Sequence, residues 1–101
     1  MSYKALLKDV YWEDCPLTEE EFIQRFPKMI NPVYAHRPEY VERQSRNIHF
    51  LYKRYAMNGY DYHTLEAAGK GLLSKEGVRQ KVKQLVRVLR SPLMRKKFFD
   101  V

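Results

Sequence analysis

Apolar residues recur at spacings of three and four along most of the chain, which is the period of a helix with one buried face. The clearest stripe lies between Ser74 and Pro92. Ser74 is placed to cap the first turn of a helix, and Pro92 is placed to end it. The apolar positions of this helix are Val78, Val82, Leu85, Val86 and Leu89. The pattern therefore predicts an all-α protein with a well-bounded helix after Ser74.

A shorter helix is predicted just before it, from Leu65 to about Leu72, with Thr64 as its N-cap. Leu65, Ala68 and Leu72 are spaced to face the second helix, and the small residues around Ala68 let the two backbones approach closely. Gly71 lies where the chain must turn. The two helices predict a helix-turn-helix, although an ordinary antiparallel helical hairpin with a solvated basic face fits the same pattern.

The second helix also carries a cationic flank. Arg79, Lys83, Arg87 and Arg90 collect beside the apolar stripe. The helix can therefore pack by one side and offer a basic ridge with the other, which suits a groove lined by phosphates.

The first 37 residues predict a helical extension that either covers the core or docks a partner. A short helix or docking arm is expected at its start, and Trp12 is expected to anchor the core rather than a partner. Thr18 and Glu21 have the spacing of a capping box that opens the next helix. Pro27 is expected to kink or end that helix.

A domain over residues 38–101 is predicted to open with a long helix near Pro38. Its apolar side is expected to consist of Val41, Ile48, Leu51, Tyr52 and Tyr55. Its cations lie largely off that side and are Arg43, Arg46, Lys53 and Arg54. Asn58 and Gly59 then supply a turn that tolerates positive φ. The end of the chain is expected to cover the basic helix with Leu93, Phe98 and Phe99.

Four short blocks follow one another in order: Arg54-Tyr55, Thr64-Leu65-Glu66, Lys75 to Gln80 (KEGVRQ) and Leu89 to Pro92 (LRSP). They are similar, at nearly the same spacing, to Arg-Phe-Gly, Thr-Leu-Glu-Glu, Arg-Glu-Arg-Val/Ile-Arg-Gln and Leu-Arg-His-Pro in one family. From about residue 45 to residue 100 the chain therefore resembles region four, the C-terminal DNA-binding region of the primary sigma factors of bacterial RNA polymerase.

The resemblance implies which residues contact DNA. In that family the start of the second helix reads base edges of the minus-35 promoter element. By position, the base readers are Lys75, Glu76, Arg79 and Gln80. The phosphate contacts implied by position or by the basic ridge are Arg46, Arg54, Thr64, Leu65, Lys83 and Arg87. The chemistry agrees, because Arg can fork onto guanine, Gln can pair with adenine and Glu can accept from cytosine.

Two departures from the family bear on base reading. Gly77 stands where the family has Arg, which removes one contact and weakens the helix by about 1 kcal/mol relative to Ala. The connection around Gly71 is one residue shorter, which shifts the register of the base contacts.

Charge is unevenly distributed over the 101 residues. The chain has a net charge of +7, with ten Lys or Arg against two acids in residues 70–101 and nine against ten in residues 1–69. The basic section coincides with the predicted helix pair, which favours a nucleic-acid partner over a merely solvated face.

Catalysis and metal binding are not expected. The three His residues are thirteen and fourteen positions apart, Cys15 is the only Cys, and neither a Gly-rich phosphate loop nor a recognisable nucleophile is present. No cofactor is implied. A single Cys, with no apolar run or leader pattern, predicts a cytoplasmic protein without a membrane segment.

The sequence thus predicts a non-enzymatic, sequence-specific DNA-binding transcription factor. The resemblance implies bacterial RNA polymerase as a partner, through the flap of its β subunit, in a split, auxiliary or phage-type sigma-like role. A single module binds weakly alone, and a monomer is favoured. The first alternative is a sigma mimic that binds polymerase without reading DNA. The second is a dimeric repressor that uses residues 1–37 as its interface.

Overall fold

The computed structural model describes residues 2–30 and 37–99. All regular structure in these residues is helical: α1 (Tyr3–Asp9), α2 (Glu19–Ile30), α3 (Pro38–Tyr55), α4 (Leu65–Ala68), α5 (Lys75–Leu89) and α6 (Pro92–Phe99). The all-α class predicted from the apolar periodicity is therefore confirmed.

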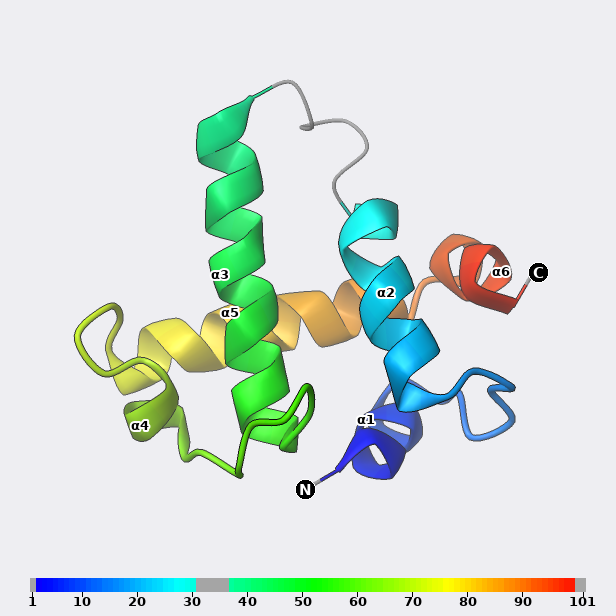
Figure 1. Cartoon of the computed structure of the whole chain (residues 1–101), viewed down its shortest axis with the longest axis horizontal. Coiled ribbons are helices and arrows are strands. Elements are labelled where there is room, and N and C mark those ends of the chain that lie inside the picture. Colours follow the sequence, from blue (N-terminus) through cyan, green and yellow to red (C-terminus); the bar gives the residue numbers. More distant parts are fainter. Residues whose placement is uncertain (1, 31–36, 100–101) are drawn as a thin grey trace.

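Helices α3 and α5 cross near the middle of the molecule (Figure 1). The short helix α4 and its turn lie beside the first part of α5. Helices α1, α2 and α6 gather at the other end of α5. The chain therefore places the amino end of α5 away from its first and last helices.

The core is continuous from α1 to α6. The predicted stripe of α5 is buried in full, at Val78, Val82, Leu85, Val86 and Leu89. Trp12 is 1% exposed, and its ring centre lies 5.1 Å from that of Phe98, in a tilted arrangement, and 6.4 Å from that of Phe22. Trp12 is thus a core anchor, as predicted, and it ties α2 to α6.

The local features that begin the helices agree with the sequence. The Thr18 hydroxyl accepts from the Glu21 amide at 3.2 Å, and the Glu21 carboxylate accepts from the Thr18 amide at 3.2 Å. Thr64 and Ser74 cap α4 and α5 through their hydroxyl oxygens. The turn after α3 has positive φ at Asn58 and Gly59. These elements depend on nearby residues, which is why the sequence predicts them.

Helix α4 is shorter than predicted. It ends at Ala68, and residues 69–74 form the connection to α5. The Leu72 and Leu73 amides both donate to the Gly69 carbonyl, and Gly71 has a φ of +80°. These turns leave Leu72 55% exposed, so the prediction that Leu72 faces α5 is wrong. Leu73 packs against the core instead.

Two further predictions are corrected. Helix α2 does not end at Pro27, which was one of the two expected effects of this proline, but continues to Ile30: Pro27 lies on the exposed side, while Phe22 and Phe26 are fully buried on the other. Packing of that apolar face outweighs the hydrogen bond that proline removes. Leu93 was expected to cover the end of α5, but it is 65% exposed. Met94, the next residue in α6, is buried in its place.

Candidate nucleic-acid interface

The four predicted base readers lie on the exposed surface at the amino end of α5. Lys75, Glu76, Arg79 and Gln80 are all exposed, and Ser74 holds the first turn in place by accepting from the Gly77 amide at 3.1 Å. None of them is covered by the described residues of the N-terminal section. The end of α5 is therefore accessible to a partner.

Three of these residues interact with one another. The Arg79 guanidinium donates to both Glu76 carboxylate oxygens, from Nε at 3.0 Å and from Nη2 at 2.5 Å. The Gln80 amide donates to the same carboxylate at 3.2 Å. The hydrogen bond from Arg79 lowers the pKa of Glu76, and its reciprocal effect raises the pKa of Arg79. The carboxylate therefore orients both donors along one face of the helix.

A groove of about 450 Å³ runs beside α5 between α3, α4 and the end of α1. Its lining includes five cations, which are Arg54, Arg79, Lys83, Arg87 and Arg90. Asp9 is the one acid among its lining residues. The floor is apolar and formed by Tyr55, Leu65, Val82 and Val86. We call this surface the cationic groove.

The cationic groove brings together five of the ten predicted DNA contacts. Arg79 comes from the reading set, and Arg54, Leu65, Lys83 and Arg87 come from the phosphate set. These residues belong to α3, α4 and α5, so the fold unites side chains that are up to 33 positions apart in the sequence. Glu76 lies next to the groove through its hydrogen bonds with Arg79, and Gln80 is in turn bonded to Glu76.

Arg90 was not among the predicted contacts, although its position on the basic flank was noted. Its guanidinium donates to the Asp9 carbonyl at 2.9 Å and lies 4.8 Å from the centre of the Tyr11 ring. Asp9 in turn accepts from the Tyr55 hydroxyl at 2.6 Å. Arg90 thus closes one end of the groove by holding α1, a tertiary contact that periodicity alone does not reveal.

Arg54 is engaged by an aromatic side chain. Its guanidinium donates to the Tyr62 hydroxyl and lies 5.2 Å from the Tyr62 ring centre. Tyr62 is itself 49% exposed. The loop after α3 therefore orients Arg54 at the edge of the cationic groove, a role that the sequence did not predict for Tyr62.

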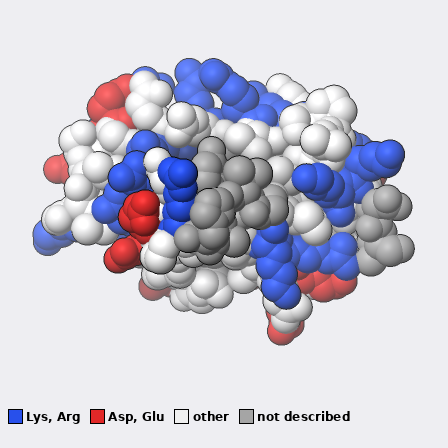
Figure 2. All heavy atoms as spheres, turned by 90° about the horizontal axis from the view of Figure 1, so that it is seen from above, with Lys and Arg blue, Asp and Glu red and all other residues white. Residues whose placement is uncertain are grey.

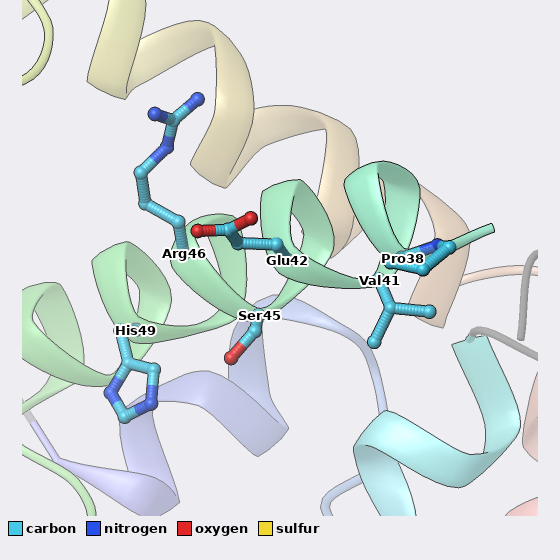
Figure 3. Close-up of a pocket in the computed structure, with 6 residues that line it drawn as sticks. All are labelled: Pro38, Val41, Glu42, Ser45, Arg46 and His49. Carbon is cyan, nitrogen blue, oxygen red and sulfur yellow. The ribbon is translucent and has the colours of Figure 1, made fainter.

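The remaining phosphate predictions are less favourably placed. The Thr64 hydroxyl accepts from the Ala67 amide at 3.1 Å, and α4 is only four residues long, which limits the dipole at its start. Arg46 lines a separate hollow along α3 rather than the cationic groove. Figure 3 shows Arg46 and Glu42 on one side of α3 and Ser45 and His49 on the other. Arg46 is therefore not one of the predicted contacts that the cationic groove unites.

Basic side chains are also prominent elsewhere on the surface. Figure 2 shows Lys and Arg in several groups on the face viewed from above, with fewer Asp and Glu. Within residues 2–30 and 37–99, no group of three or more His, Cys, Asp and Glu could hold a metal ion. No helix in the same residues has the length and apolar character needed to cross a membrane.

Comparison with protein-family models, curated proteins and solved structures found no match for this chain.

Proposed function

We propose that the protein is a sequence-specific DNA-binding transcription factor in which α4 and α5 act as a helix-turn-helix. The amino end of α5 enters the major groove, which is about 12 Å wide and admits a helix. The cationic groove contacts the phosphate backbone beside it. The single observation that carries the proposal is that Arg54, Arg79, Lys83 and Arg87 converge on one groove, next to exposed Glu76.

The side chains at the amino end of α5 have the chemistry of base readers. Arg79 can donate two hydrogen bonds to guanine, and Gln80 can both donate to and accept from adenine; each such bidentate contact contributes about 1–3 kcal/mol of discrimination. Glu76 can accept from cytosine. Because Glu76 already orients Arg79 and Gln80, the readers are partly arranged before DNA binds.

Bacterial RNA polymerase is the proposed partner, with the β-subunit flap as the docking site. This part of the proposal depends on the resemblance to sigma region four. A single module buries only about 600–1,000 Å² on DNA, so a partner that tethers the protein to the promoter compensates for weak binding. We propose that the protein acts as a monomer in this complex.

A selection from duplex DNA with a randomised segment tests base reading. The full chain should enrich a defined motif, and Arg79→Ala with Gln80→Ala should abolish that enrichment. The matched control is Arg43→Ala with Gln44→Ala, an adjacent Arg and Gln on α3 that line a different groove. The control should enrich the wild-type motif. Enrichment of the same motif by both double variants would end the base-reading proposal.

Binding to purified bacterial RNA polymerase and sedimentation separate the two alternatives. Polymerase binding without any enriched DNA motif would favour the sigma mimic. A stable dimer at micromolar concentration, together with a palindromic motif, would favour the repressor. The proposal requires a monomer, polymerase binding and a motif without two-fold symmetry.

A further inference from the structure

A second groove lies on the other flank of α5. It has a volume of about 350 Å³, and its lining from α5 is Lys81, Gln84, Leu85 and Val88. None of these residues lines the cationic groove, and the residues it takes from α3, which lie between Tyr40 and Asn47, are distinct as well. We call it the α3–α5 groove. A ligand there therefore does not need the surface proposed to contact DNA.

A buried polar atom in this groove lacks a partner. Asn47 lines the groove and is 8% exposed, and its side-chain Oδ1 accepts no hydrogen bond from residues 2–30 and 37–99. A buried acceptor that gains no donor loses its hydration without compensation. The groove therefore favours a ligand that supplies an N–H or O–H group at Asn47.

The charged side chains that line the groove are cationic. Arg43 and Lys81 line it, and the Arg43 guanidinium lies 5.7 Å from the centre of the Tyr40 ring. The Arg37 guanidinium lies 5.6 Å from the same ring. Among the described residues that line this groove, none is Asp or Glu. This charge distribution favours an acidic ligand.

Part of the groove surface is apolar. Val88 is 41% exposed although it belongs to a helix whose other valines are buried, and Leu85 lies beside it in the lining. An exposed aliphatic side chain beside cations suits a ligand with both apolar and acidic groups. A phosphate backbone offers only acceptors, so it supplies neither the donor for Asn47 nor a cover for Val88.

We propose that the α3–α5 groove binds an acidic peptide segment of a partner protein. Carboxylates of the peptide pair with Arg43 and Lys81, an apolar side chain covers Val88, and a peptide N–H donates to Asn47 Oδ1. Because this surface is separate from the cationic groove, the protein binds the peptide and DNA at the same time. The inference does not depend on the proposed DNA binding.

Selection of peptides from a displayed random library against the full chain tests this inference. The selected peptides should be rich in Asp and Glu next to an apolar residue. One of them, synthesised with a fluorescent label, serves as the probe in anisotropy titrations at physiological salt. Arg43→Glu with Lys81→Glu should weaken its binding at least about tenfold. The matched control, Arg54→Glu with Lys83→Glu, makes the same change of charge in the cationic groove and should leave peptide affinity nearly unchanged.

Replacement of Asn47 tests the unpaired acceptor. Asn47→Leu should weaken peptide binding while leaving the melting temperature of the free protein equal or higher, because no hydrogen bond to Oδ1 is lost. Asn47→Ala is the second variant if the larger side chain prevents folding. Amide chemical shifts on peptide titration should change over residues 40–47 and 81–88.

Three results would overturn the inference. The first is a selection that returns no peptide or returns peptides without acids. The second is an affinity that neither Asn47 variant changes. The third is a set of chemical-shift changes centred on the cationic groove. Simultaneous binding of duplex DNA is measured separately, so loss of DNA binding alone bears on the proposed function and leaves this inference standing.

Discussion

The Arg79 guanidinium and the Glu76 carboxylate form a bidentate ion pair on the exposed surface of α5, with hydrogen bonds of 3.0 and 2.5 Å. Both side chains are proposed base readers, and in the free protein each is a hydrogen-bond partner of the other. DNA must therefore either bind the pair as a unit or replace Glu76 as the acceptor for Arg79.

Replacing Glu76 with Gln should strengthen binding to duplexes of unrelated sequence. The substitution releases Arg79 from its ion pair and removes a negative charge beside the phosphates, so the slope of log K against log salt should become steeper by about one unit. Discrimination between the selected motif and unrelated DNA should fall. Fluorescence anisotropy over a range of salt concentrations measures both effects. Glu20→Gln, which removes the same charge from an exposed position in the first turn of α2, is the control and should change neither.

Lys83→Ala should weaken binding to all duplexes by a similar factor and make the salt slope shallower by about one unit, because Lys83 is proposed to contact phosphate. Lys4→Ala removes the same charge from α1, outside the cationic groove, and should leave the slope unchanged. If Lys83→Ala instead altered the selected motif, the reading face of α5 would be rotated from the register proposed here.

Replacing Gly77 and Gly69, which lie on either side of the turn between α4 and α5, with alanine should change the stability of the protein in opposite directions. A Cβ at Gly77 would lie 3.4 Å from its nearest neighbours, which is ordinary contact, so Gly77→Ala should stabilise the protein by up to about 1 kcal/mol. A Cβ at Gly69 would overlap the Val78 side chain and lie 2.6 Å from the Leu73 carbonyl oxygen. Gly69→Ala should therefore destabilise by about 1–3 kcal/mol. Thermal unfolding followed by Trp12 fluorescence measures both, and equal effects would contradict the close approach of α4 and α5.

Acid should weaken the cap of α2. Hydrogen bonds from the Thr18 amide and hydroxyl lower the pKa of Glu21 from its usual 4.5. A carboxylate whose pKa is lowered on folding stabilises the protein above its unfolded pKa and loses that effect as pH falls through the folded value. The difference in melting temperature between wild type and Glu21→Gln should therefore be smaller at pH about 3 than at pH about 7.

The same substitution in a Thr18→Ala background is the matched control for the cap of α2. Without the Thr18 hydroxyl, the pH dependence of the Glu21→Gln effect should be smaller. An identical dependence in both backgrounds would show that the Thr18 hydroxyl does not cause it, because the Thr18 amide, which also donates to Glu21, is kept in Thr18→Ala.

Features that depend on neighbouring residues were predictable from the sequence. The buried stripe from Val78 to Leu89 follows from helical periodicity, and the Ser74 and Thr64 caps follow from a hydroxyl placed before an apolar run. The exposed basic flank of α5 follows from the same periodicity, which explains why Arg79, Lys83 and Arg87 were correctly expected on one side.

Features that depend on tertiary contacts were not predictable. The early end of α4 results from turns around Gly69, whose backbone lies against Val78 and Leu73. The continuation of α2 through Pro27 depends on burial of Phe22 and Phe26 by other helices. The unpaired Asn47 oxygen and the contact of Arg90 with Asp9 involve pairs of helices whose positions only the fold determines.

Two further contacts join the beginning of the described chain to its end. The Arg95 guanidinium donates to the Asp14 carboxylate at 2.7 Å, and the Trp12 ring packs against Phe98. These partners are more than eighty positions apart, so Asp14 and Trp12 cannot make these contacts until α6 has left the ribosome. The aromatic contact of Trp12 with Phe98 is therefore one of the last that the chain can form, whereas its contact with Phe22 is available much earlier in translation.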